Sequence, residues 1–233
     1  MSRPWWTRLA IVAIGLAAVG IGAASGGVRA LAPAMTASPF DGPLPACRID
    51  DRLTPHRGED AWALTFLDQA YTLDADDVPS DLVDLESQGI DGAVSVRRFV
   101  IDDLAAMADA ARDAGAPFRV TSAYRSYAQQ VRTFASLEAT LGRDEALRSA
   151  ARPGHSEHQL GTTIDVAGGE KWLASHAWRY GFALSYPPKL SPQTTCYKPE
   201  PWHFRYIGRD SARELRDSGL SLRAWLWARQ AGD

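Results

Sequence analysis

Two short segments of the sequence contain most of the side chains that could perform metal chemistry. The first is residues 154–165 (GHSEHQLGTTID) and the second is residues 200–203 (EPWH), and together they hold three of the five histidines. A catalytic zinc site needs three imidazole or carboxylate ligands, an open position for water, and a separate carboxylate that takes a proton from that water. The two segments can supply all four protein groups.

The spacing of the second segment restricts how it can be folded. Successive side chains of a strand point to opposite faces, so Glu200 and His203 could not serve one site from within the same regular strand. Pro199 and Pro201 flank Glu200 and favour an extended turn outside the ladder. We therefore expect Glu200 in a turn and His203 on the strand that follows.

A glycine separates two candidate ligands of the first segment. Gly161 lies between His158 and Asp165, and we expect it to break the path from a loop to a strand so that the two side chains converge. His155, three residues before His158, could ligate in its place. A single histidine is more often structural than a metal ligand, and E-x-x-H alone matches many proteins by chance. The zinc hypothesis therefore depends on the two segments together.

Hydrophobic patterning indicates the elements that must position these groups. Helical spacing followed by Gly115 predicts a helix over residues 96–114, and a β-type run over residues 118–123 precedes a second helix over residues 127–141. Later patterns predict strands over residues 162–166 and 202–207 and helices over residues 170–180, 211–217 and 221–230. No regular βαβ repeat and no glycine-rich phosphate loop is present in the sequence, so we predict an α+β fold.

Composition and charge exclude some classes of function. The 233 residues are 45% hydrophobic and 23% charged, which is ordinary for a globular protein. Lysine and arginine number 25 against 28 aspartates and glutamates, a net charge of −3, and no long basic block occurs. We therefore expect no nucleic-acid partner.

The N-terminus has the pattern of an export signal. Arg3 and Arg8 precede a 16-residue run of small and apolar residues, positions 9–24 (LAIVAIGLAAVGIGAA). The run is typical of a signal-peptide core or a short membrane anchor, and an A-x-A cleavage site at residues 30–32 leaves both alternatives open. The predicted organisation is residues 1–32 as signal peptide or anchor, residues 33–46 as a linker, and residues 47–233 as a single catalytic domain.

The sequence has two cysteines, Cys47 and Cys196. Export would permit a disulfide between them, although their spacing does not prove one. The alternatives are therefore a disulfide and two buried thiols.

At the level of motifs the sequence resembles the VanY-type D-alanyl-D-alanine carboxypeptidases. Their metal motif, S-x-H-x-x-G-x-x-x-D followed by E-x-W-H, is similar to residues 156–165 (SEHQLGTTID) and residues 200–203 (EPWH). Upstream, residues 122–130 (SAYRSYAQQ) resemble the S-x-Y-R-S-x-x-x-Q substrate segment, and residues 76–83 (DDVPSDLV) resemble the N-terminal lead-in. The resemblance covers approximately residues 61–207.

The resemblance implies a role for each matched residue. The implied ligands of one Zn²⁺ are His158, Asp165 and His203, with Glu200 as general base and then general acid. Arg125 would bind the free carboxylate of a peptide or the oxyanion that develops during attack. The implied substrate-binding residues are Tyr124, Arg125, Ser126, Gln130, Ser156 and Trp202. In this register His155 belongs to the rim of the site or behind a ligand, with an ordinary loop histidine as the alternative. Thr163 stands where the family usually has alanine, with little expected effect on zinc.

The resemblance also implies a fold and a function. The fold would be Hedgehog/DD-peptidase-like, with a small antiparallel sheet that carries the zinc site and is packed with helices. The function would be hydrolysis of the terminal D-alanine bond, D,D- or L,D-, of peptidoglycan stem peptides in cell-wall maturation. We expect an extracytoplasmic monomer, secreted or anchored to the cytoplasmic membrane facing the cell wall. The alternatives are a peptidoglycan endopeptidase and a non-catalytic, metal-stabilised module that binds the cell wall; Glu200 argues against the module, which would not need a base.

Overall fold

The computed structural model describes residues 42–55 and 59–231. All of these belong to one compact unit, Ala37–Asp233. The predicted signal peptide or anchor and most of the predicted linker lie outside the described residues, so that division of the chain stays a prediction. Within the described part of the chain, no helix combines the length and apolar character that crossing a bilayer requires.

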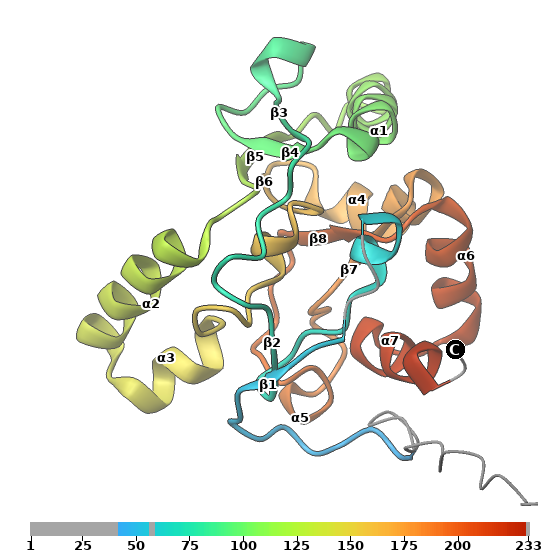
Figure 1. Ribbon diagram of the computed structural model, residues 1–233. Coiled ribbons are helices and arrows are strands. Elements are labelled where there is room, and N and C mark those ends of the chain that lie inside the picture. The colour runs from blue at the N-terminus through green and yellow to red at the C-terminus, as the bar shows by residue number, and fades with distance from the viewer. Residues whose placement is uncertain (1–41, 56–58, 232–233) are drawn as a thin grey trace, which may run out of the picture. The chain divides into compact units, whose positions relative to one another are not determined.

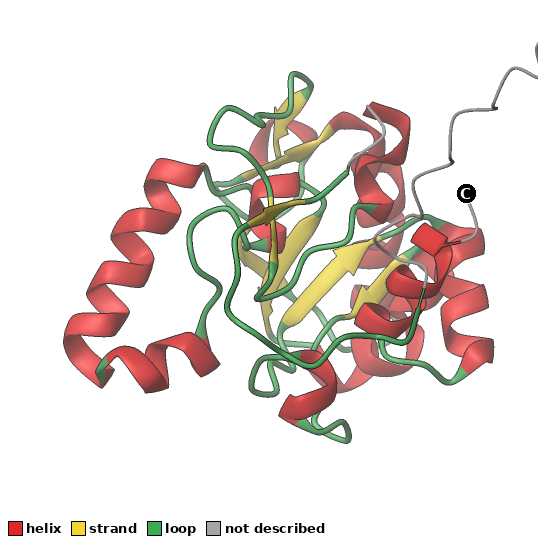
Figure 2. Cartoon of the chain, turned by 60° about the horizontal axis from the view of Figure 1, so that its bottom comes forward, coloured by secondary structure: helices red, strands yellow, loops and turns green. Residues whose placement is uncertain are grey.

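A four-stranded antiparallel sheet carries the groups of chemical interest. Its strand order is β5-β6-β8-β7, and Figure 2 shows its strands between the helices. The strands are β5 (Arg119–Ser122), β6 (Thr163–Ala167), β7 (Phe182–Leu184) and β8 (His203–Tyr206). In the register of β6 with β8, Asp165 lies directly opposite His203. Two candidate ligands are therefore neighbours across one pair of strands.

The helices divide into two groups. Figure 1 shows α2 (Tyr127–Leu141) and α3 (Arg143–Ser149) projecting together on one side, and the larger helices of the other group on the opposite side. That second group comprises α1 (Ile101–Asp113), α4 (Glu170–His176), α6 (Arg209–Ser218) and α7 (Leu222–Ala231). Leu104 and Met107 of α1 are fully buried and share a core cluster with Ile164 and Phe204 of the sheet. This packing fixes the strands that carry the site.

The remaining elements are short. They are β1 (Arg52–Leu53), β2 (Tyr71–Thr72), β3 (Leu82–Asp84), β4 (Ser95–Arg97), α5 (Pro192–Thr195) and the 3-10 helices η1 (Glu59–Leu64), η2 (Glu86–Gln88), η3 (Arg98–Val100), η4 (Glu157–Leu160) and η5 (Ala177–Tyr180). Strands β1 and β2 pair in parallel, and β3 and β4 pair antiparallel.

The prediction of an α+β fold with a small antiparallel sheet is confirmed, with corrections at several elements. The predicted helix over residues 96–114 starts too early, because Ser95–Arg97 pairs with β3 as strand β4 and the α-helix begins only at Ile101. Four short strands (β1, β2, β3 and β7) and two helices (α3 and α5) were not predicted, and the predicted helix over residues 170–180 is α4 followed by the 3-10 helix η5. The second predicted helix is confirmed at Tyr127–Leu141.

Residues 47–55 and 59–72, here called the N-terminal strap, are tied to the rest of the domain by covalent and polar contacts. Cys47 and Cys196 form a disulfide with a Cα–Cα distance of 5.3 Å, which decides between the two alternatives left open by the sequence. Asp68 of the strap forms a buried ion pair with Arg223 of α7 at 2.7 Å. The N-terminal strap is therefore part of the folded domain.

Candidate active site

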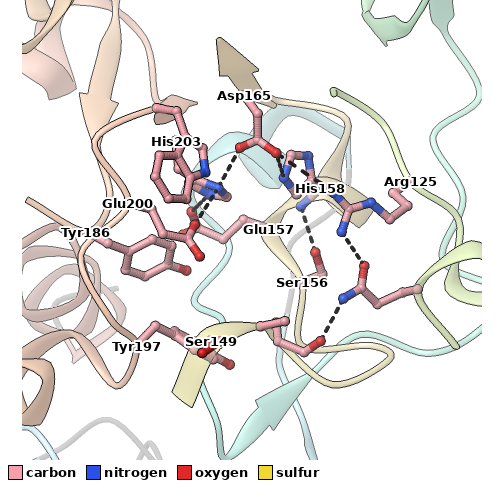
Figure 3. Close-up of a pocket in the computed structure, with 14 residues that line it drawn as sticks. Arg125, Ser149, Ser156, Glu157, His158, Asp165, Tyr186, Tyr197, Glu200 and His203 are labelled. Atoms are coloured by element: carbon pink, nitrogen blue, oxygen red, sulfur yellow. Dashed lines mark hydrogen bonds and ion pairs between the residues drawn. The ribbon is translucent and has the colours of Figure 1, made fainter. Parts of the chain in front are cut away.

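His158, Asp165 and His203 direct their donor atoms toward a common point. These donor atoms all lie within 4.8 Å of one another. Asp165 stands between the two imidazoles, with Oδ2 at 3.1 Å from His158 Nε2 and Oδ1 at 3.0 Å from His203 Nδ1 (Figure 3). The three residues predicted as ligands are therefore brought together in one cluster.

The turn between the first two of these residues depends on a glycine. His158 lies in η4, whose first backbone groups are capped by the Ser156 hydroxyl, which accepts a hydrogen bond from the His158 N–H at 3.3 Å. Gly161 ends η4 with a left-handed φ of 68°, and a Cβ there would lie 3.0 Å from Cγ of Arg97. The chain then enters β6 and places Asp165 beside His158, as the sequence predicted.

Each imidazole is oriented by the nitrogen that faces away from the cluster. His158 Nδ1 donates a hydrogen bond to the carbonyl oxygen of Ala123 at 2.6 Å, and His203 Nε2 donates to Oε2 of Glu157 at 3.1 Å. Both partners are acceptors, so each far nitrogen carries a proton. The near nitrogens, His158 Nε2 and His203 Nδ1, are then available as metal ligands.

The donor set fits a zinc ion. Two imidazole nitrogens and a carboxylate are ligands that catalytic zinc commonly takes. Asp165 Oδ1 is buried and has no hydrogen-bond partner among the described residues, although it faces the ring of His203. Burial works to lower the pKa of His203, but its contacts with Asp165 and Glu157 outweigh burial and raise that pKa to about 10. The point between His203 Nδ1 and Asp165 thus attracts positive charge, and a divalent cation held there would take the place of the proton.

Glu200 lies in the turn before β8, as expected from its flanking prolines. Its backbone N–H donates to the carbonyl of Tyr186 at 2.9 Å, and its own carbonyl accepts from the His203 N–H at 3.1 Å. Its Oε2 lies 3.3 Å from His203 Nδ1. Burial, reinforced by the neighbouring Asp165, raises the pKa of Glu200, and His203 only partly opposes this. The carboxylate is thus placed as a proton acceptor beside the metal ligands.

Arg125 is fixed at the other side of the cluster, next to the end of β5. Its Nη1 donates to Oε1 of Gln130 at 2.7 Å, and its Nη2 donates to the Ser122 hydroxyl at 3.0 Å. Gln130 is itself buried, and its Nε2 donates to the carbonyl of Ala151 at 2.6 Å. Gln130 therefore orients Arg125 as well as lining the site. The guanidinium lies 3.9 Å from Oδ2 of Asp165, within reach of a ligand at the metal site.

A cavity of about 230 Å³ opens in front of the cluster. Besides the three predicted ligands and Glu200, the predicted residues that line it are Arg125, Gln130, Ser156 and Trp202. Other lining residues were not predicted: Ser149, Ala150, Ala151, Glu157, Tyr186 and Tyr197. The rings of Tyr186 and Tyr197 meet edge to face at 5.4 Å, and burial raises the pKa of both. These two neutral side chains form an aromatic wall near Glu200.

Two residues expected to bind substrate have other positions. Among the described residues that line the cavity, neither Tyr124 nor Ser126 is present. Ser126 instead caps α2: its hydroxyl accepts from the Gln129 N–H, and the Gln129 side chain accepts from the Ser126 N–H. The Ser-x-x-Gln spacing is that of a capping box, which is a signal that the sequence contained.

His155 faces away from the cluster. Its Nδ1 lies 2.7 Å from the carbonyl of Asp68, and its Nε2 lies 3.0 Å from Oδ1 of Asp51. It belongs neither to the rim of the site nor behind a ligand, which corrects that expectation and leaves the alternative of a structural histidine. Its partners lie in the N-terminal strap, so it links that strap to the ligand-bearing segment.

The comparison with known proteins decides the family. The VanY family model, described as D-alanyl-D-alanine carboxypeptidase, matches residues 93–209 and so includes every residue of the cluster. The chain belongs to the VanY family. The resemblance stated from the motifs is therefore confirmed.

Curated relatives carry names that agree with VanY membership. The chain is 32% identical over 182 residues to YodJ of Bacillus subtilis (strain 168), whose name assigns it provisionally to the carboxypeptidases; the alignment covers 70% of this chain and 66% of YodJ. It is 38% identical over 91 residues to a D-alanyl-D-alanine carboxypeptidase of Enterococcus faecalis (strain ATCC 700802 / V583), covering 35% of this chain and 34% of that protein. The alignments thus span less than two thirds of these relatives' own lengths.

Solved structures of VanY-like proteins share the fold. The LdcB LD-carboxypeptidase has a TM-score of 0.64 at 27% identity, covering 74% of this chain and 93% of that one. The vancomycin-resistance D,D-pentapeptidase VanY of a VanB-type cassette, solved in complex with Zn(II), also has a TM-score of 0.64 at 27% identity, covering 71% and 99%. VanYB in complex with D-Alanine-D-Alanine gives 0.63 at 27% identity, covering 71% and 97%. The predicted fold is confirmed.

The departure from the VanY motif at Thr163 lies inside the sheet. Thr163 is fully buried, faces Arg205 across the β6–β8 register, and its hydroxyl has no hydrogen-bond partner within the described chain. That hydroxyl therefore forms no hydrogen bond with the ligand side chains. The expectation of little effect on zinc stays a prediction.

Proposed function

We propose that this protein is a zinc-dependent carboxypeptidase that removes the terminal D-alanine from peptidoglycan stem peptides. The observation that carries the proposal is the arrangement around one cavity of His158, Asp165 and His203 with Glu200 on one side and Arg125 on the other. Membership of the VanY family and the names of the relatives support the substrate class. His158, Asp165 and His203 would hold one Zn²⁺ ion, which the donor set and the Zn(II) complex of the VanY neighbour support.

The protein side of the reaction follows from the position of Glu200. When bound, zinc supplies a Lewis acid that acidifies water and polarises the scissile carbonyl. Glu200 accepts the proton of the attacking water, because its Oε2 lies beside the ligand nitrogen of His203. The same carboxyl then donates this proton to the leaving amine, and its raised pKa suits both transfers.

Arg125 selects the end of a peptide. Its guanidinium is held by Gln130 and Ser122 and can bind the terminal carboxylate through parallel hydrogen bonds. The cavity of about 230 Å³ is smaller than the usual ligand pocket of roughly 300–1,000 Å³. Ala150 and Ala151 form part of its wall. These features favour a small terminal residue over the interior of a cross-linked peptide, and so favour a carboxypeptidase over an endopeptidase.

We further propose that the protein works outside the cytoplasm as a monomer, either secreted or held at the membrane by its N-terminus. The apolar run at residues 9–24 and the disulfide between Cys47 and Cys196 support export, because disulfides persist in oxidising compartments.

Digestion of purified stem peptides tests the proposed activity. The zinc-loaded protein is incubated with tetrapeptide and pentapeptide stems, with and without a zinc chelator, and the products are weighed by mass spectrometry. Loss of D-alanine from the pentapeptide alone identifies a D,D-carboxypeptidase, and loss from the tetrapeptide identifies an L,D-carboxypeptidase. Glu200→Gln is the matched control: it should abolish hydrolysis and leave the zinc content unchanged. If the zinc-loaded wild type trims neither stem, the carboxypeptidase proposal is wrong, and cleavage of a cross-linked dimer then separates an endopeptidase from a binding module.

A further inference from the structure

A buried carboxylate that takes no part in the proposed reaction lies behind one of the ligands. Glu157 is 6% exposed and is labelled beside His203 in Figure 3. Its Oε2 accepts hydrogen bonds from His203 Nε2 at 3.1 Å and from the Ser185 hydroxyl at 2.7 Å. Its Oε1 accepts from Nη1 of Arg205 at 2.8 Å. Both oxygens of Glu157 are therefore occupied by groups of the domain.

The guanidinium that holds Glu157 is anchored in the N-terminal strap. Arg205 is fully buried, and its Nη2 donates to the carbonyls of Ala63 at 2.9 Å and Thr65 at 2.5 Å. Ala63 and Thr65 precede the match to the VanY family model, which begins at residue 93. A chain of contacts thus runs from the N-terminal strap through Arg205 and Glu157 to His203.

Sequence position explains why one carboxylate can reach this place. His203 and Arg205 are two residues apart on β8, so their side chains leave the same face of the sheet. Glu157 immediately precedes His158 in η4, so its backbone belongs to the segment that carries one ligand and its side chain contacts another. Glu157 therefore fixes the two histidines relative to each other.

Stability alone does not explain the buried pair of Glu157 and Arg205. Burying a carboxylate and a guanidinium removes both from water, and apolar residues of similar volume often stabilise a protein equally well. An apolar residue in place of Glu157 could not accept the hydrogen bond from His203 Nε2. The imidazole would then be free to rotate or to change tautomer. A carboxylate behind a ligand histidine sets its orientation and increases its basicity.

We propose that Glu157 is a positioning residue for the metal centre: it holds His203 with Nδ1 toward the zinc and strengthens it as a ligand, while Arg205 holds Glu157. This inference rests on the zinc site of the proposed function.

Zinc affinity measured on the folded protein tests the inference without recourse to hydrolysis. The full chain is stripped of metal, and its zinc dissociation constant is measured by competition with a chromophoric chelator. Glu157→Gln keeps the size of the side chain and removes its charge, and we expect a 10- to 100-fold weaker affinity. The matched control is Asp103→Asn, because Asp103 accepts from Tyr206 of the same strand and from Arg209 but contacts no ligand. Its zinc affinity should stay within about twofold of wild type, the ordinary scatter of context effects.

A second variant protects the test against misfolding. Glu157→Gln leaves the buried guanidinium of Arg205 without its counter-charge, so the double variant Glu157→Gln/Arg205→Met removes both charges. The folded double variant should show the same loss of zinc affinity. Wild-type zinc affinity in a folded Glu157→Gln protein, or in the double variant if the single one does not fold, would overturn the inference. Failure of the proposed function has a different signature, since the wild type would then bind no zinc or trim no peptide.

Discussion

Removal of the Cys47–Cys196 disulfide should lower the free energy of unfolding by several kcal/mol. The two cysteines are separated by 149 positions. In the chain-entropy description, a cross-link across such a separation removes about 17 cal/mol/K from the unfolded state, which amounts to about 5 kcal/mol at 25 °C. For a domain of this size that corresponds to a fall in Tm of roughly 10–20 °C. This figure is an upper value, because residual structure in the unfolded chain reduces it.

The assay is urea unfolding of the double variant Cys47→Ser/Cys196→Ser against the wild type. Both proteins are measured with the metal removed, because zinc bound to the native state would add stability of its own. Wild type treated with a reductant should reproduce the curve of the double variant. A decrease in the free energy of unfolding of less than about 1 kcal/mol would refute the reasoning. It would mean that the strap stays near residue 196 in the unfolded chain even without the disulfide.

The same variant should retain its turnover number at temperatures where it is folded. Hydrogen bonds hold the loop from Cys196 to Glu200 in addition to the disulfide: the Gln69 side chain donates to the Cys196 carbonyl at 2.8 Å, and the Lys198 N–H donates to the Arg148 carbonyl at 2.9 Å. The base itself is held through the Tyr186 carbonyl. A large fall in kcat with an intact fold would show that the disulfide positions Glu200.

Three further changes test other parts of the site. Because burial raises the pKa of Glu200 and the protonated carboxyl cannot accept a proton, kcat/KM should fall on the acid side at a pH above the ordinary value of 4.5, with the loss complete below the shifted pKa. A pH–rate profile checks this, and an acid limb below that value would contradict it. Thr163→Val removes a buried hydroxyl that has no partner in the described chain and should raise the free energy of unfolding by about 1 kcal/mol; an unchanged or lower value in urea unfolding would show that water satisfies the hydroxyl. Gly161→Ala forces a left-handed φ of 68° on a residue with a Cβ, 3.0 Å from Arg97, and should destabilise the protein by more than about 1 kcal/mol and weaken zinc binding. Wild-type stability and zinc affinity would show that this turn does not set the positions of His158 and Asp165.

The reactive groups could be predicted from the sequence because local chemistry constrains them. Prolines around Glu200 leave that segment few conformations, a glycine after His158 can adopt the left-handed φ that other residues avoid, and the structure has the turns expected at both places. The helix over Tyr127–Leu141 could be predicted equally well, since its apolar spacing and its capping residues are both local to the segment. Such features need no knowledge of distant residues.

Elements that depend on distant partners were missed or misplaced. Val96 and Arg97 extend the helical pattern of α1, but pairing with Val83 and Leu82 recruits them to a strand. Strand β7 has only three residues, too few for a period to be recognised.

Glu157 illustrates the same limit inside the site. Glu157 occupies a variable position of the S-x-H-x-x-G motif. Its role can be inferred only from its contact with Arg205, which lies 48 residues later in the sequence. The i, i+2 spacing of His203 and Arg205 on a predicted strand was the available signal, since it puts a guanidinium on the ligand face. A buried arginine there requires a carboxylate partner.

Because Asp165 and His203 face each other across β6 and β8, metal binding depends on how these two strands are paired. If either strand slipped by one position, its ligand would turn to the far face and the cluster would lose a donor. Zinc can therefore bind tightly only to chains whose two strands have paired in the native alignment. Metal supplied during folding would bind chains with the native strand alignment in preference to misaligned ones, and would thereby shift the population toward the native pairing.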